Sequence, residues 1–116
     1  MREQKDDLVY IRHIHDAIER ILSYKSSSSF DTFSNNEWDQ AAVIRYFEII
    51  GEATTKLSPA FKQAHPEIEW RDISDFRNFL IHDYMDIDVK IVWDTMTINL
   101  PPLKGKISKI LESSAN

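Results

Sequence analysis

Apolar residues recur at intervals of three and four along most of the chain, with polar and charged residues between them. This spacing gathers the apolar side chains on one face of a helix. No stretch shows the strict alternation of apolar and polar residues that is typical of a strand. The pattern therefore predicts an all-α protein, and the breaks between the periodic stretches indicate where its helices end.

The first half of the chain predicts two long helices joined by a serine-rich break. The first covers about residues 5–24, and its apolar stripe comprises Leu8, Ile11, Ile14, His15, Ile18, Ile21 and Leu22. The second extends to about residue 57, and its candidate caps are Ser34, Asn35 and Asn36. Gly51 lies inside the second helix, where a glycine costs about 1 kcal/mol relative to alanine. We interpret it as a point at which a neighbouring helix approaches closely.

Prolines interrupt the helical pattern in the second half of the chain. Ser58-Pro59 predicts a short capped turn, because proline is well tolerated at the first helical position, and His65-Pro66 predicts another interruption. A third main helix is expected to begin near Trp70. It should direct Ile73, Phe76 and Leu80 inward. Residues 85–88 indicate a corner, with Asp88 as the cap of a fourth helix that contains Ile91, Val92 and Met96.

Pro101-Pro102 must break or kink the fourth helix, because neither proline can donate a backbone hydrogen bond. Residues 103–111 continue the amphipathic pattern beyond them. The sequence thus predicts a single helical domain over residues 1–116. We expect an antiparallel four-helix bundle with a proline-kinked last helix.

Composition narrows the classes of function. The net charge of −5 argues against a general nucleic-acid coat, although an acidic protein can act on RNA if its cations gather in a cleft. The absence of cysteine excludes disulfides, thiolate metal sites and thiol nucleophiles. No apolar run approaches the roughly 18 residues of a membrane span, and no charged-then-apolar leader opens the sequence. We therefore expect a cytoplasmic protein that does not enter a membrane.

The segment from Arg77 to Tyr84 contains the candidate catalytic residues. It places Arg77, Asn78, His82 and Tyr84 within two helical turns. Arginine holds a phosphate through two parallel hydrogen bonds, and histidine moves protons at cellular pH. A cation beside a proton shuttle indicates phosphodiester chemistry.

These residues resemble a known family. Arg77-Asn78, three intervening residues and His82 match the R-polar-x3-H signature of HEPN-domain ribonucleases, and Tyr84 completes the H-x-Y extension of the HepT toxin branch. Residues 45–53 are similar to the second-helix segment of that branch. Residues 91–93 and 100–103 are similar to its last helix.

The resemblance implies a metal-independent endoribonuclease toxin of a type VII-like toxin–antitoxin pair, with no cofactor and with an active cleft between two protomers. It implies Arg77 and His82 as the catalytic pair and Asn78 as the residue that orients the phosphate or the arginine. It also implies a nucleotidyltransferase antitoxin of the MntA type, which attaches AMP to Tyr84. The expected partners are thus a second copy of the chain, that antitoxin and an RNA substrate.

Helix geometry raises a difficulty for this pair. Residues five apart on an ideal helix are separated by about 140° around the axis, so Arg77 and His82 do not share a face. Either the helix ends or bends before His82, or the site is completed across a two-fold axis between protomers. We expect both, with two copies of the motif facing one another in a dimer groove.

Other interpretations stay open at this point. A non-catalytic helical adaptor that binds a nucleotidyltransferase and nucleotides is the alternative function, and Arg77 could simply pair with Asp75, Asp83 or another carboxylate. We reject a metal site at His13 and His15, because residues two apart on a helix point roughly 160° away from each other. The three tryptophans are expected to be core and interface anchors.

Overall fold

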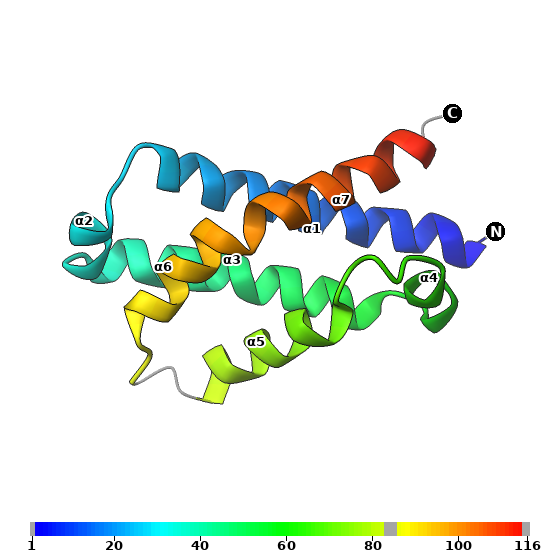
Figure 1. The fold of residues 1–116 in the computed structure, drawn as a ribbon. Coiled ribbons are helices and arrows are strands. Elements are labelled where there is room, and N and C mark those ends of the chain that lie inside the picture. The colour runs from blue at the N-terminus through cyan, green and yellow to red at the C-terminus, as the bar shows by residue number, and fades with distance from the viewer. Residues whose placement is uncertain (1, 83–85, 115–116) are drawn as a thin grey trace.

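The computed structural model describes residues 2–82 and 86–114, with side chains from Asp6 onward. Over these ranges the chain is helical and contains no strand. The bundle has four members, each antiparallel to its neighbours in the chain (Figure 1). They are α1 (Arg2–Ser26), α3 (Glu37–Lys56), α5 (Trp70–His82) and the consecutive pair α6 (Val89–Ile98) and α7 (Leu100–Ser114). Two short helices, α2 (Phe30–Ser34) and α4 (Pro59–Ala64), lie in the connections. The predicted all-α bundle is confirmed.

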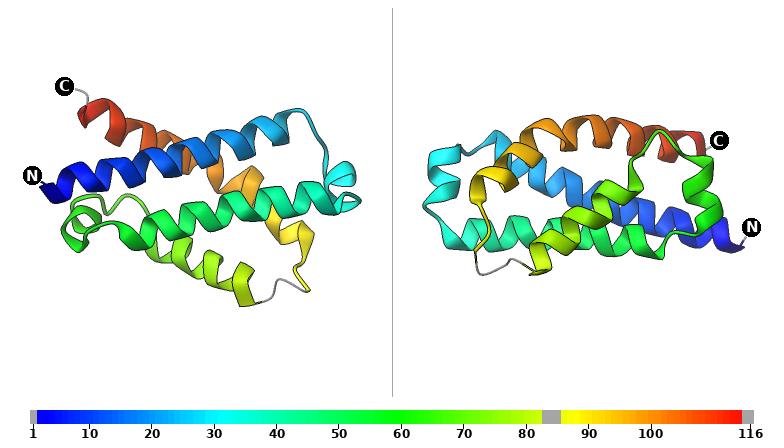
Figure 2. Two further views of the ribbon diagram at one scale, coloured as in Figure 1. Left: turned by 180° about the vertical axis from the view of Figure 1, so that it is seen from behind. Right: turned by 60° about the horizontal axis from the view of Figure 1, so that its bottom comes forward.

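The core lies between α1, α3 and the α6–α7 pair, while α5 packs on the outer side of α3 (Figures 1 and 2). In α1 the fully buried residues are Ile11, Ile14, Ile18 and Ile21, whereas the predicted stripe members Leu8, His15 and Leu22 are only half-buried. The stripe is therefore real, but its centre lies on the four isoleucines. Opposite them, α3 contributes Val43, Phe47 and Ile50.

Side-chain caps define the helix ends as the sequence predicts. The side chain of Asn36 accepts a hydrogen bond from the backbone N–H of Asp39 and begins α3. Ser58 and Asp88 cap α4 and α6 in the same way. Each cap satisfies one of the N–H groups that the first turn of a helix leaves without a partner.

The prolines at the start of α7 produce the expected kink. Helix α6 ends at Ile98, Asn99 forms the joint, and Pro101 and Pro102 occupy the first turn of α7. Prolines are tolerated there because the N–H groups of a first turn have no partner inside the helix. The change of direction between the two helices is visible in Figure 2.

A buried carboxylate fastens the start of α1 to the α3–α4 corner. Asp7 is only 4% exposed, and it accepts hydrogen bonds of 2.7 Å from the backbone N–H and 2.8 Å from the hydroxyl of Ser58. The same hydroxyl accepts from the N–H of Phe61 as the α4 cap. This contact joins residues 51 positions apart in the chain.

Candidate active site around Arg77 and His82

Helix α5 presents the motif, and buried contacts at both ends fix its position. At its start, the indole N–H of Trp70 donates to the carbonyls of Lys62 and His65. Near its end Leu80 is fully buried. Between them, the ring of Phe76 meets that of Phe47 on α3 edge to face, with centroids 5.1 Å apart. The exposed side of α5 is therefore determined by its packing on α3.

Arg77 lies directly against Gly51 of α3. A Cβ atom placed on Gly51 would overlap the Cβ of Arg77 and would lie 2.5 Å from its Cδ and 2.7 Å from its Cγ. Real Cβ atoms essentially never come closer than 3.0 Å to a neighbour. The aliphatic stem of the arginine thus occupies the space that any other residue at position 51 would fill, which confirms the close approach expected there.

The guanidinium of Arg77 has no carboxylate partner among the described residues. It forms no ion pair and no side-chain hydrogen bond within residues 6–82 and 86–114, and its Nε is buried without a partner. Asp75, one of the pairing partners considered above, is therefore not engaged with it. A buried donor without a partner costs about 1–3 kcal/mol, so the position of this Nε calls for an explanation.

A second arginine occupies the nearby carboxylates of α3. Arg45 pairs with Glu48 at 3.6 Å and with Glu52 at 3.4 Å. Both glutamates belong to α3, the helix on which Arg77 packs. Within the described residues, both glutamates pair with Arg45 and neither pairs with Arg77.

His82 is the last residue of α5, and its side chain is exposed, as is that of Asn78. Helix α5 therefore includes His82, and the expectation that the helix ends before this residue is wrong. The backbone stays helical from Trp70 to His82, and the fully buried Leu80 joins its last turns to the core. On one such helix Arg77 and His82 leave the axis about 140° apart. Asp83, Tyr84 and Met85 lie outside the described residues.

A hollow adjoins the end of the motif. It measures about 470 Å³ and lies between α3 and the end of α5, lined by Ala41, Ile44, Arg45, Glu48, Ile81 and Ile87. Ile81 immediately precedes His82 in the chain, but neither His82 nor Arg77 lines this hollow.

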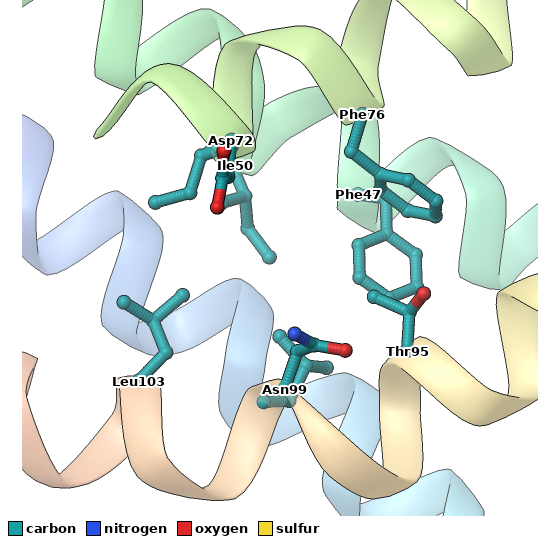
Figure 3. A pocket seen from close by; sticks show the side chains of 9 residues that line it. Phe47, Ile50, Asp72, Phe76, Thr95, Asn99 and Leu103 are labelled. Atoms are coloured by element: carbon teal, nitrogen blue, oxygen red, sulfur yellow. The ribbon is translucent and has the colours of Figure 1, made fainter. Parts of the chain in front are cut away.

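A separate pocket of about 190 Å³ opens on the other flank of α5, where it faces the α6–α7 joint (Figure 3). Phe47 and Phe76 form one wall, and Thr95, Asn99 and Leu103 form the other. Neither Arg77 nor His82 lines it. The pocket belongs to the packing of α5 and not to the motif.

The histidines and tryptophans outside the motif differ in exposure and in their neighbours. His13 is exposed, and His15 lies 3.4 Å from Asp16 and 3.6 Å from Glu19. Trp70 is buried and Trp93 is half-buried, but Trp38 is 87% exposed and is not a core residue. No cluster of three or more metal-ligating side chains occurs in the described part of the chain. No helix of that part is long and apolar enough to cross a membrane.

Over the residues that the structure describes, the protein is all-helical, and one helix carries an exposed histidine and an arginine with no carboxylate partner in that part of the chain. Residues 14–110 match the family described as Ribonuclease HepT-like, and the chain belongs to this family. The resemblance seen in the motif is thereby confirmed.

Individual relatives agree over nearly the whole chain. A probable ribonuclease HepT of Thermococcus cleftensis is 41% identical over 94% of this chain and 96% of its own length. A putative RNase of Caldanaerobacter subterraneus subsp. tengcongensis is 31% identical over 89% and 92%. A protein of Methanocaldococcus jannaschii named as a gamma-glutamylcyclotransferase and putative RNase is 36% identical, and this chain covers 49% of it. No solved structure gives a significant match.

The sequence did not reveal the contact between Arg77 and Gly51. A glycine inside a long helix was the available signal, and it correctly indicated a close neighbour. It did not indicate which residue that neighbour is, because the two positions belong to helices whose pairing appears only in the folded chain.

Proposed function

We propose that this chain is the endoribonuclease toxin of a type VII-like toxin–antitoxin pair, acting without a metal in the cytoplasm. Membership of a ribonuclease family gives the class of enzyme. The observation that supports the catalytic assignment is the state of Arg77. Its stem is held against α3, and its charge has no carboxylate partner among the described residues. A basic group kept in this way suits a phosphate of the RNA backbone.

RNA carries its own nucleophile, so the chemistry needs few protein groups. In the proposed reaction the 2′-hydroxyl attacks the adjacent phosphorus and the bond to the 5′-oxygen breaks. The products are a 2′,3′-cyclic phosphate and a 5′-hydroxyl. His82 removes the 2′-proton or protonates the departing 5′-oxygen. Arg77 stabilises the charge on the non-bridging oxygens, and Asn78 orients the phosphate or the arginine.

The site is proposed to be completed by a second copy of the chain. Arg77 and His82 diverge by about 140° on one uninterrupted helix, so a single protomer does not direct both at one phosphate. A two-fold axis near the exposed side of α5 would bring Arg77 of one protomer toward His82 of the other. The RNA would then lie in the groove between the two copies of α5.

Regulation is proposed to act through Tyr84. An MntA-type nucleotidyltransferase would transfer AMP to the hydroxyl of this tyrosine and release pyrophosphate from ATP. The adduct adds bulk and negative charge seven residues from Arg77, nearly on the same helical face if the helical course continues. It would compete with the RNA phosphate for the arginine, so the toxin would be silenced sterically and electrostatically.

The test is incubation of the purified protein with total RNA in EDTA. Cleavage that persists in EDTA and disappears in His82→Ala, with an unchanged circular dichroism spectrum, supports catalysis by the chain itself. An inert wild-type protein, shown by mass spectrometry to carry unmodified Tyr84, favours the non-catalytic adaptor that binds a nucleotidyltransferase and nucleotides.

A further inference from the structure

We propose that Gly51 is a positioning residue for the ribonuclease reaction: it lets α3 hold the stem of Arg77 in one place. The inference rests on the proposed function, because it gives a role in catalysis to a residue that touches no substrate. Gly51 has no side chain, and the stem of Arg77 occupies the space that a side chain would need.

The contact cannot be relaxed by turning the arginine side chain. A Cβ on Gly51 would overlap the Cβ of Arg77 itself, and that atom is fixed by the backbone of α5. The two helices would have to move apart. The edge-to-face contact of Phe47 with Phe76 opposes such a movement, because it lies in the same α3–α5 interface.

The consequence for Arg77 is a fixed direction. Its Cβ, Cγ and Cδ all lie against Gly51, and the next atom, Nε, is buried. A phosphate arriving from solvent therefore meets the terminal nitrogens of a guanidinium whose stem is already immobilised. A preorganised group loses less freedom when it engages the transition state, so it contributes more to the rate.

The chain provides a matched control in its other glycine. Gly105 also lies in a helix, and a Cβ placed on it meets nothing within 4 Å. The same substitution, glycine to alanine, thus removes the clamp at one position and is harmless at the other. Neither glycine has a positive φ, so backbone strain does not separate the two variants.

The kinetic experiment compares Gly51→Ala and Gly105→Ala in RNA cleavage. Gly51→Ala should lower kcat by about 100-fold, the cost of a small misplacement of a catalytic group, and should change KM by less than about twofold. Gly105→Ala should match the wild type in both. A folded Gly51→Ala protein with wild-type kcat overturns the proposal.

A second measurement does not depend on activity or on the variant folding. In the wild-type protein, ¹⁵N relaxation of Arg77 Nε should give an order parameter near that of rigid backbone, about 0.85, whereas exposed Arg12 should fall below about 0.6. A mobile Arg77 Nε overturns the proposal even if Gly51→Ala is unfolded. If the wild-type protein fails to cleave RNA while Arg77 Nε is rigid, the proposed function fails and the clamp stands as a structural contact.

The Gly51→Ala substitution, made in the wild type and in Arg77→Gly, tests the contact itself. Arg77→Gly removes all three clashing atoms, so Gly51→Ala should raise the urea midpoint in that background although it lowers the midpoint in the wild type. A decrease of similar size in both backgrounds would show that Gly51 is needed for a reason other than Arg77, and would overturn the proposal.

Discussion

Arg77 and His82 lie five residues apart on one uninterrupted helix, so their side chains leave it in directions about 140° apart. This relationship is the reason to expect a catalytic site shared between protomers. It also makes the shared site testable, because a site within one protomer and a site across two protomers respond differently to mixed dimers.

The first prediction concerns those mixed dimers. Arg77→Ala and His82→Ala proteins, each inactive alone, should regain about a quarter of wild-type cleavage after unfolding together and refolding in equal amounts. Random pairing makes about half of the dimers mixed, and each mixed dimer holds one intact Arg77–His82 pair across its two-fold axis. Gel electrophoresis of cleaved RNA measures the recovery. No recovery, with mixed dimers demonstrated by differently tagged chains, would place both residues of each pair in the same protomer.

The second prediction concerns the charge and shape of Arg77. Arg77→Ala should reduce cleavage by about 100-fold, which corresponds to the roughly 3 kcal/mol typical of a lost transition-state donor. Arg77→Lys keeps the charge and most of the stem but loses the two parallel hydrogen bonds, so its rate should fall between those of the wild type and Arg77→Ala. Gel filtration should show unchanged dimers in both variants. Full activity in Arg77→Ala would remove the phosphate-binding role.

The third prediction concerns Tyr84. Mass spectrometry after co-expression with a cognate nucleotidyltransferase should find one or more adenylate groups on this tyrosine. Tyr84→Phe should escape both the modification and the loss of ribonuclease activity, because it lacks the acceptor hydroxyl. An adduct found solely on other residues would contradict the proposed regulation.

The fourth prediction concerns the buried carboxylate of Asp7. Asp7→Ala should lower the free energy of unfolding by about 1–3 kcal/mol, since it leaves the partly buried backbone N–H of Ser58 without its acceptor. Asp6→Ala is the matched control, because Asp6 is exposed and adjacent. Urea denaturation followed by circular dichroism measures both. Equal midpoints for the two variants would show that the Asp7–Ser58 contact does not stabilise the fold.

The fifth prediction concerns alkaline pH. Burial raises the pKa of Tyr24, whose hydroxyl donates a 2.8 Å hydrogen bond to Asp39. The folded state therefore binds the phenolic proton more tightly than the unfolded state. The resulting stability is complete below the ordinary tyrosine pKa of about 10 and is lost as the pH rises through the higher folded value. Urea midpoints should accordingly fall less steeply above about pH 10 in Tyr24→Phe than in the wild type. Parallel curves would exclude this contribution.

The helices and their ends were predictable because their signals are local. The Asn36, Ser58 and Asp88 caps each act on an N–H group two or three residues away, so the sequence alone contains both partners. Helix α2 was not predicted, because five residues do not complete two helical turns and give no periodic pattern. Its hydrophobic anchor, Phe33, is nevertheless fully buried.

The long-range contacts were not predictable for the opposite reason. In the sequence, Asp7 is one of several acidic residues of the first helix, and only the fold brings Ser58 to it. The types of residue in the candidate site followed from the Arg77–His82 motif. Their surroundings did not, because the approach of Gly51 to Arg77 depends on the packing of α3 against α5.

The exposure of Trp38 gives the protein a built-in optical reporter. Its indole, 87% exposed in the first turn of α3, should emit at the long wavelengths of an aromatic ring in water, while buried Trp70 should emit at shorter ones. Anything that covers this end of α3 would shift only the first component. A partner that covers this end of α3 can thus be detected by intrinsic fluorescence, without attaching a dye, and Trp38→Phe supplies the blank.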